Sequence, residues 1–363
     1  MTELRDQTHI AAVRFEKAAR NQSEKRRVRR QLPELTRLER LLCEAPACFS
    51  AEVITRVSAG PLELPVYQVT VGNAPADAPA LLLVGGVHGL ERIGTEVILA
   101  WLDSLSQRLR WDHQLAELLD RVRLVLVPIL NPGGMLMNRR SNPQGVDLMR
   151  NAPLWAQTDS AWMLGGQRFS RHLPWYTGTP EITMEAESLA LEKLIMELLP
   201  GRPFSLSLDC HSGFGQKDRI WFPYAYRRRP MRRVADMMAL KLLWQQAYPH
   251  HDYLFEPQSA QYLTHGDLWD YFYKQVNKAH DLRYLPLTLE MGSWRWVRKR
   301  PRQLLRLDGL FNPQVPHRHQ RVLRAHLLWL DFLLKATAHH HQWLPKGEQE
   351  FTLRQAALMH WYQ

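Results

Sequence analysis

A run of five apolar residues, Ala80 to Val84, leads directly into the sequence GGVHGLE at residues 85–91. A strand can be apolar at every position when both of its faces are covered, as in the interior of a parallel sheet flanked by helices. We therefore expect a central strand of an α/β sheet at this point. Ligands of such sheets bind just beyond the carboxyl ends of the strands, which is where His88 and Glu91 fall.

The spacing of His88 and Glu91 suits the binding of one metal ion. Two glycines permit a sharp turn, and a separation of three residues brings the imidazole and the carboxylate to one side of it. This pair of donors is typical of catalytic zinc sites, in which three protein ligands leave one position open for water. The same residues also fit an ordinary helix start near Arg92, so a metal site requires a third ligand elsewhere in the chain.

Strand-like and helix-like segments alternate through most of the chain. Residues 53–58 and 64–72 predict a hairpin, and three later apolar segments predict buried strands at 123–130, 203–212 and 285–290. Helices are expected at 93–107, 113–120, 181–199, 230–247, 266–276 and 319–336. This alternation predicts an α/β/α fold, with a mostly parallel, mixed and twisted sheet between two helical layers.

The chain of 363 residues is long enough for one large domain with a small appendage. Residues 1–50 are expected to form an N-terminal helical extension, because leucines recur there at helical spacing. We expect these leucines to pack on the main domain at residues 51–340, although a partner helix is an alternative. Residues 341–363 are expected to be a C-terminal tail. The irregular segment 131–179 is long enough to be functional.

The chain contains 47 basic and 36 acidic residues, a net charge of +11 that favours anionic partners. Basic residues are densest at 24–30, 226–233 and 294–302. Such runs usually form solvated surfaces, although nucleic acid or an acidic membrane surface would also fit. The sequence shows no signal-like segment, no apolar stretch long enough to span a membrane and no paired cysteine spacing. We expect a cytoplasmic location, and the oligomeric state is left open.

Polar side chains follow four of the predicted buried strands. His88 and Glu91 follow the first strand, and the segment 131–150 follows the second. His211 and Glu290 lie at the ends of the other two. Because the carboxyl ends of parallel strands meet at one edge of a sheet, we expect these groups to form one site.

Together these motifs resemble the zinc carboxypeptidase family, the metallopeptidases typified by carboxypeptidase A, which also include deacylase and murein-peptide amidase branches. The resemblance covers roughly residues 55–335 and rests on GGVHGLE, NPGG with RRSNPQGVDLMRN, LDCHSG and TLEMGS. It implies a zinc-dependent hydrolase of amide bonds, with residues 51–340 as its catalytic domain.

The resemblance also implies a role for each matching residue. One zinc ion would be bound by His88, Glu91 and His211, and Glu290 would be the general base and acid. A bound cation lowers the pKa of its water to about 7, and a nearby carboxylate can take the proton as that water attacks a carbonyl. Arg140 would stabilise the resulting oxyanion.

Three further residues would bind the substrate. Arg150 matches the arginine that grips a terminal carboxylate through two parallel hydrogen bonds. Arg139 adjoins Arg140 and could take its place. Tyr262 is similar to a tyrosine on a mobile loop of the family. Other tyrosines occur nearby in the sequence, and Tyr262 fits a packed aromatic residue of the core at least as well.

Two residues depart from the family pattern. Met149 stands where an asparagine usually shares the carboxylate grip with Arg150, and a thioether cannot donate a hydrogen bond. Trp269 stands where a residue usually lines the pocket for the terminal side chain of the substrate, so its bulk would reshape that pocket.

We therefore expect a metallocarboxypeptidase that releases C-terminal residues from peptides. One alternative is a deacylase or amidase acting on a small N-acyl amino acid or a murein-derived peptide, a change that Met149 and the adjacent arginines would favour. Another is an inactive basic protein that binds nucleic acid or a membrane surface on the same scaffold. It is disfavoured because such a protein would have no use for the intact set of candidate ligands.

Overall fold

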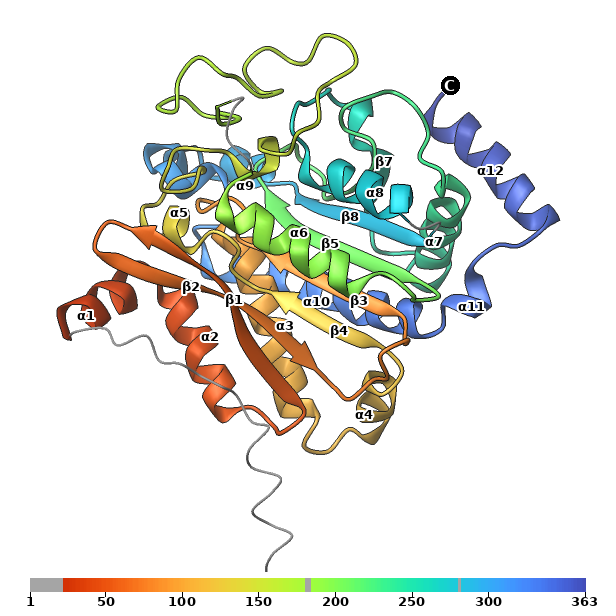
Figure 1. Ribbon diagram of the computed structural model, residues 1–363, viewed down its shortest axis with the longest axis horizontal. Helices are drawn as coiled ribbons and strands as arrows, with labels where there is room; N and C mark the ends of the chain where they lie inside the picture. Colours follow the sequence, from red (N-terminus) through yellow and green to blue (C-terminus); the bar gives the residue numbers. More distant parts are fainter. Residues whose placement is uncertain (1–21, 180–183, 280–281) are drawn as a thin grey trace, which may run out of the picture.

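The computed structural model describes residues 22–179, 184–279 and 282–363, and its centre is an eight-stranded mixed sheet (Figure 1). The strand order across the sheet is β1-β2-β4-β3-β5-β8-β6-β7. The strands are β1 (Phe49–Ala59), β2 (Leu62–Val71), β3 (Ala80–Gly85), β4 (Arg123–Val127), β5 (Ser205–Ser212), β6 (Arg219–Phe222), β7 (Leu254–Pro257) and β8 (Tyr284–Met291).

The middle of the sheet is parallel, as the sequence predicts. Strand β3 pairs in parallel with β4 and β5, and β5 pairs in parallel with β8. Every residue of β3, β5 and β8 is buried, which accounts for their nearly continuous apolar character. The expected hairpin β1–β2 joins β4 in antiparallel fashion, and β6 joins β8 likewise. The carboxyl ends of the three buried strands therefore lie at one edge of the sheet.

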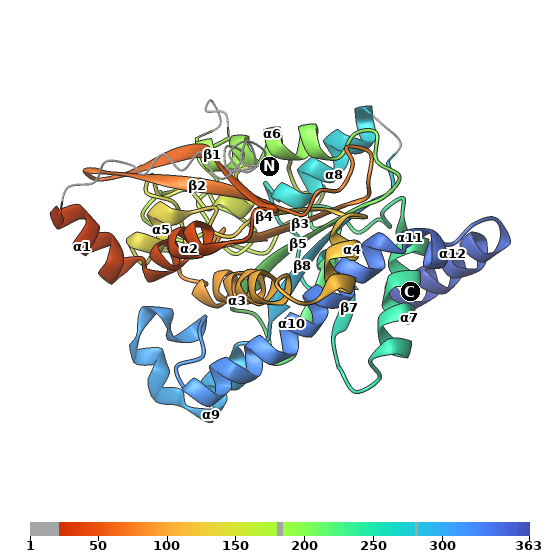
Figure 2. The same ribbon diagram turned by 90° about the horizontal axis from the view of Figure 1, so that it is seen from below.

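Helices cover both faces of the sheet (Figure 2). Helices α3 and α10 contact β3 on one face, whereas α6 and α8 lie on the other. The α-helices are α1 (Gln22–Gln31), α2 (Pro33–Glu44), α3 (Arg92–Arg108), α4 (His113–Leu119), α5 (Pro132–Leu136), α6 (Ala186–Leu198), α7 (Val234–Ala247), α8 (Leu268–Ala279), α9 (Trp294–Lys299), α10 (Pro316–Ala338), α11 (His340–Trp343) and α12 (Glu348–Trp361). Short 3₁₀ turns occur at Leu148–Arg150, Gln258–Ala260, Pro301–Leu305 and Leu307–Leu310. The predicted α/β/α architecture is confirmed.

The N-terminal region packs on the main body of the protein. Leu35 and Leu38 of α2 are buried in the same apolar core as the sheet. Arg92, the first residue of α3, donates to both carboxylate oxygens of Glu34 at 2.8 and 2.6 Å. The expectation that these leucines pack on the domain therefore agrees with the structure. Residues 1–21 of the expected extension lie outside the described residues.

The C-terminal region is helical, whereas the sequence predicts only a tail at residues 341–363. Helix α12 lies beside α7, and Ala357 is fully buried. The indole nitrogen of Trp361 donates to the carbonyl oxygen of Phe255 at 2.7 Å, which ties the end of the chain to β7. Strands β6 and β7 and helix α9 are also not anticipated, because each has only four to six residues. Among the described residues, no helix combines the length and apolar character needed to cross a membrane.

Candidate metal centre

Two adjacent parallel strands bring the candidate ligands together. His88 and Glu91 lie in the turn between β3 and α3, and His211 lies near the end of β5. The turn requires glycine at Gly86, whose φ is 65°. A Cβ atom at Gly94 would lie 2.2 Å from the carbonyl oxygen of Cys210, so this glycine allows α3 to approach β5 closely. The backbone therefore presents the three side chains to one point.

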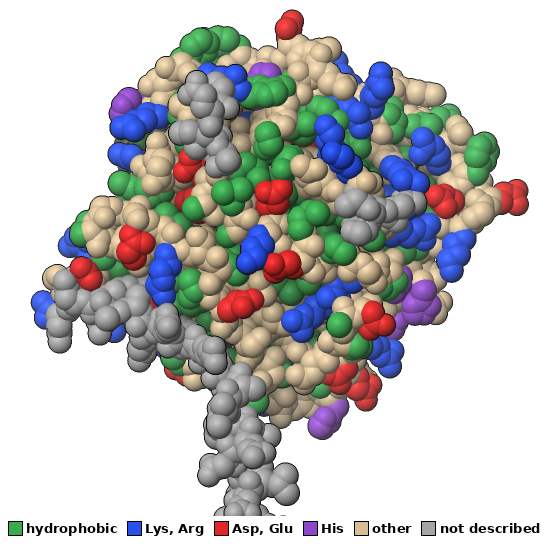
Figure 3. All heavy atoms as spheres, in the orientation of Figure 1, with side chains coloured by type: hydrophobic (Ala, Val, Ile, Leu, Met, Phe, Trp, Pro, Cys, Tyr) green, Lys and Arg blue, Asp and Glu red, His purple; other side chains and the backbone are tan. Residues whose placement is uncertain are grey.

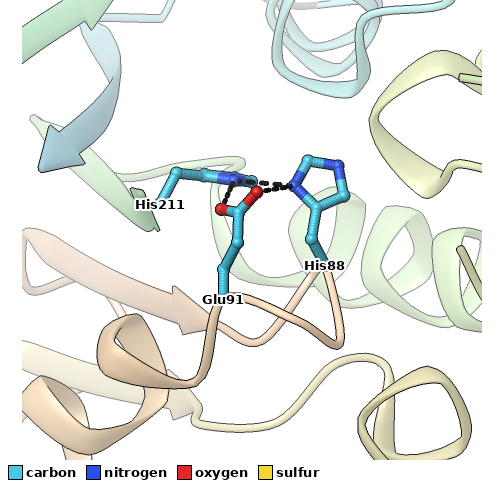
Figure 4. Close-up of side chains that lie close together, drawn as sticks. All are labelled: His88, Glu91 and His211. Atoms are coloured by element: carbon cyan, nitrogen blue, oxygen red, sulfur yellow. Dashed lines mark hydrogen bonds and ion pairs between the residues drawn. The ribbon is translucent and has the colours of Figure 1, made fainter. Parts of the chain in front are cut away.

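The three candidate ligands are buried and in mutual contact (Figure 4). Nδ1 of His88 lies 2.9 Å from one oxygen of Glu91, and Nδ1 of His211 lies 3.0 Å from the other. The two Nδ1 atoms are 3.1 Å apart. One ligand atom from each residue lies within 4.8 Å of the others, a set that could hold a single metal ion. Two imidazole nitrogens and one carboxylate oxygen form a donor set suited to zinc.

Each imidazole is held from its far side by a buried aspartate. Nε2 of His88 is 2.9 Å from Asp147, and Nε2 of His211 is 2.6 Å from Asp209. A carboxylate on one ring nitrogen fixes the tautomer and leaves the other nitrogen free to bind a metal. The arrangement of both rings therefore fits metal coordination through Nδ1.

Asp147 and Asp209 are not among the site residues predicted from the sequence. Both lie inside motifs on which the resemblance rests, at GVDL and LDCHSG, so their proximity to the site was implicit. What the motifs do not give is the direction of each side chain. In the structure both aspartates are fully buried beside the imidazoles.

The charges of the site explain the shifted pKa values of the ligands. Burial alone would raise the pKa of Glu91, but His88 and His211 hold it well below its usual value. Burial would lower the pKa of His211, but Asp209 and Glu91 raise it well above its usual value. The carboxylates around these rings stabilise positive charge, so a bound cation would meet favourable electrostatics here.

Glu290 faces the ligands from the next strand. It lies opposite His211 in the parallel register of β5 and β8. One carboxylate oxygen accepts a hydrogen bond from the backbone N–H of Phe214 at 2.9 Å. Burial, together with the negative charge of Glu91, raises the pKa of Glu290 to about 8. A carboxyl group with such a pKa can exchange a proton near neutral pH.

The structure distinguishes between the two adjacent arginines. Arg140 donates from Nη1 to Glu91 at 2.9 Å and from Nε to Asp147 at 2.9 Å. Burial would lower the pKa of Arg140, but Asp147 and Glu91 raise it above its usual value. The side chain of Arg139 is exposed. Arg140 therefore supplies the permanent positive charge beside the candidate ligands, and a substrate-binding role for Arg139 stays a prediction.

Arg150 and Tyr262 lie close together near the same site. Arg150 is only 3% exposed, and its Nη1 donates to the carbonyl oxygen of Met149 at 3.1 Å. Burial raises the pKa of Tyr262, while Arg150, which is hydrogen-bonded to it, opposes the shift. The ring of Tyr262 lies 5.9 Å from that of Phe214, whose N–H binds Glu290. These contacts place Tyr262 near Glu290 and Arg150 beside Tyr262.

The two departures from the family pattern have different structural consequences. The side chain of Met149 is buried among apolar residues, and its backbone N–H donates to Asp147 at 3.0 Å. The indole nitrogen of Trp269 donates to Asp209 at 2.8 Å, so this residue holds the aspartate behind His211. The sequence assigned Trp269 only to a substrate pocket, and the structure shows this additional contact.

Comparisons with known proteins agree with the fold and identify the family. Residues 53–295 match the family model described as zinc carboxypeptidase. Carboxypeptidase D of Anas platyrhynchos is 28% identical over 161 residues, which are 41% of this chain and 10% of that protein. Carboxypeptidase E of Caenorhabditis elegans is 26% identical over 179 residues, which are 45% of this chain and 36% of that protein. The aligned parts therefore span well under half of these relatives.

Solved structures support the same architecture. Thrombin activatable fibrinolysis inhibitor superposes with a TM-score of 0.63 and 19% identity, over 83% of this chain and 72% of that one. Carboxypeptidase A from Helicoverpa armigera gives a TM-score of 0.61 and 17% identity, over 83% of this chain and 71% of that one. At these identities the likeness shows the fold alone. Since the family model covers most of the chain, this protein belongs to the zinc carboxypeptidase family.

Proposed function

We propose that this protein is a zinc-dependent carboxypeptidase that releases C-terminal residues from peptides. The observation that carries the proposal is the convergence of His88, Glu91 and His211 on one point, with Glu290 on the neighbouring strand. When bound there, zinc would polarise a carbonyl group and activate water for attack on it.

Glu290 would move the proton during the reaction. Its carboxylate is held by the N–H of Phe214, which leaves the other oxygen to accept a proton from the attacking water. The same carboxyl group would then deliver that proton to the nitrogen of the leaving amine. The raised pKa of Glu290 supports this role, because a base works best when its pKa is near the operating pH.

The arginines would bind the negative charges of the substrate and of the transition state. Arg140 is oriented by Asp147 and lies beside Glu91, where its charge would stabilise an oxyanion. Arg150 would bind the terminal carboxylate, with Tyr262 beside it. Both arginines are largely withdrawn from solvent, which strengthens their interaction with an anion.

A second candidate function is hydrolysis of small N-acyl amino acids or murein-derived peptides. Met149 motivates it, because a buried thioether contributes no donor to a terminal carboxylate where the family usually has an asparagine. A substrate that presents its anionic group differently would be less affected by this change.

Matched substrates would test the proposal and separate the two candidates. Peptides with a free C-terminal carboxylate, the same peptides as C-terminal amides, and N-acyl amino acids should be compared before and after chelation and zinc restoration. We expect zinc-dependent release from the free peptides and little release from the amides. Turnover confined to N-acyl amino acids would favour the alternative. Activity that survives chelation, or that is equal in Glu290→Gln, would contradict both.

A further inference from the structure

A basic segment beyond the last buried strand has no part in the proposed chemistry. It comprises α9 and the two 3₁₀ turns that follow, residues 294–310, and we refer to it as the docking segment. Figure 2 shows it projecting below the helical face of the molecule, at the lower left. This segment contains the whole of the basic run at residues 294–302.

The docking segment exposes large aliphatic side chains. Leu304, Leu305 and Leu307 are 56%, 88% and 78% exposed, and Trp294 at its start is 45% exposed. Single exposed leucines are common on protein surfaces, but three within four positions form a concentrated apolar projection. Contact with water is unfavourable for these side chains, so burial against a partner would be favoured.

Cations surround the leucines in the sequence. Between residues 298 and 307 there are five basic residues and no acidic residue. All five are exposed: Arg298, Lys299, Arg300, Arg302 and Arg306. Asp308 follows this stretch and accepts from Arg306 at 3.1 Å. The docking segment therefore combines exposed leucine side chains with a net positive charge.

Buried contacts hold the projection in a defined shape. The side-chain nitrogen of Gln303 donates to the carbonyl oxygen of Gly309 at 2.6 Å. A Cβ atom at Gly309 would lie 1.8 Å from the backbone oxygen of Gln303, so the backbones of these two residues are in direct contact. At the base, Arg295 donates to both oxygens of Asp218 at 2.8 Å. The leucines are therefore displayed by an ordered turn.

The base of the docking segment also contacts the loop that follows His211. The indole nitrogen of Trp294 donates to the carbonyl oxygen of Gly213 at 2.8 Å. The hydroxyl of Ser212 donates to the carbonyl oxygen of Phe311, just beyond the segment, at 2.7 Å. The base of the docking segment is therefore tied to the loop that follows one of the candidate ligands.

We propose that the docking segment binds the surface of an anionic lipid bilayer. Leucines can enter the boundary between headgroups and acyl chains, while flanking arginines and lysine contact the lipid phosphates. The combination of positive charge and exposed leucines favours a lipid surface over a nucleic acid as the partner. A nucleic acid would be bound through cations and aromatic stacking, and would not require the leucines.

Vesicle sedimentation of the full chain would test the proposal. We expect binding to phosphatidylcholine vesicles that contain phosphatidylglycerol and little binding to phosphatidylcholine alone. The pair Leu305→Ser and Leu307→Ser should lower the partition coefficient by roughly tenfold or more. Arg300→Gln and Arg302→Gln should each lower it by roughly fivefold. The matched control is Phe351→Ser with Met359→Ser on α12, which removes two side chains that are 64% and 66% exposed.

Three outcomes would overturn the proposal. The first is failure of the unaltered protein to bind the anionic vesicles. The second is vesicle binding by the double leucine variant that equals that of the unaltered protein. The third is binding to duplex DNA that matches vesicle binding and depends only on the arginines.

Melting temperature and hydrolysis of a soluble peptide would show that each variant is folded. If the double leucine variant does not fold, hydrogen exchange of the unaltered protein decides, since docking requires protection of residues 298–307 on anionic vesicles.

Discussion

Asp209 lies directly behind His211, with an oxygen 2.6 Å from Nε2 of the imidazole. The same oxygen accepts a hydrogen bond from the indole nitrogen of Trp269 at 2.8 Å. All three side chains are buried, so the ring of His211 has little freedom to rotate. The orientation of one candidate ligand thus depends on a tryptophan from α8, far away in the sequence.

Removing this support should weaken metal binding. We expect Asp209→Asn to lower zinc affinity by roughly 10- to 100-fold, because the amide no longer holds the imidazole in the tautomer that binds through Nδ1. Trp269→Phe should have a smaller effect in the same direction. Competition with a chromophoric chelator would measure both. Unchanged zinc affinity in Asp209→Asn would show that the contact is not needed for coordination.

Glu290→Gln should separate metal binding from catalysis. We expect kcat to fall by roughly 10²- to 10⁴-fold, because the amide of glutamine cannot accept the proton of water. Zinc affinity should change little, since Glu290 lies outside the three candidate ligands. Steady-state kinetics and zinc titration on the same preparation provide the measurement. Loss of zinc together with activity would assign Glu290 to coordination instead.

The two adjacent arginines should behave differently. Arg140→Ala removes the charge that binds Glu91 and Asp147, so we expect kcat/KM to fall by roughly 10²- to 10³-fold. Arg139→Ala alters an exposed side chain, so we expect it to lower kcat/KM much less than Arg140→Ala does. Peptide hydrolysis by the two variants, measured side by side, gives the comparison. A large loss in Arg139→Ala alone would reverse the assignment.

Gly266→Ala should disturb substrate binding through the backbone. A Cβ atom there would lie 1.9 Å from the carbonyl oxygen of Arg150, so this residue must shift. We expect KM for peptides with a free carboxylate to rise by roughly tenfold or more, since a small misplacement of a binding group is costly. Gly201→Ala is the matched control, because it also has a positive φ but has open space around it. Equal KM values in the two variants would contradict the prediction.

Glu187 should make stability depend on pH. Burial raises its pKa to about 7, so the folded protein retains a proton that the unfolded chain releases above its ordinary value of 4.5. Stability from this group therefore falls as pH rises through this interval, by on the order of 3 kcal/mol. Glu187→Gln should lack this loss, whereas Glu197→Gln, which alters an exposed residue of the same helix, should retain it. Urea unfolding at pH 5 and pH 8 would give the change in the free energy of unfolding for the three proteins. An equal change in Glu187→Gln and in the unaltered protein would exclude the effect.

Local sequence determined the elements that carry the site. The apolar run before His88 indicated a strand covered on both faces, and the equivalent runs before His211 and Glu290 placed those residues at the same sheet edge. The resemblance to the zinc carboxypeptidase family implied the candidate ligands, because its motifs contain His88, Glu91 and His211. Short strands such as β6 escaped prediction, since four residues carry too little periodicity.

Only the tertiary structure decided how the side chains meet. Arg140, and not its neighbour Arg139, contacts Glu91 because of the side of the loop that faces the site, and no local pattern specifies that direction. The pairing of Asp209 with Trp269 likewise joins β5 to α8. Such contacts are selected by packing between segments distant in sequence, so they follow from the whole fold, whereas periodicity reports only on the element that contains it.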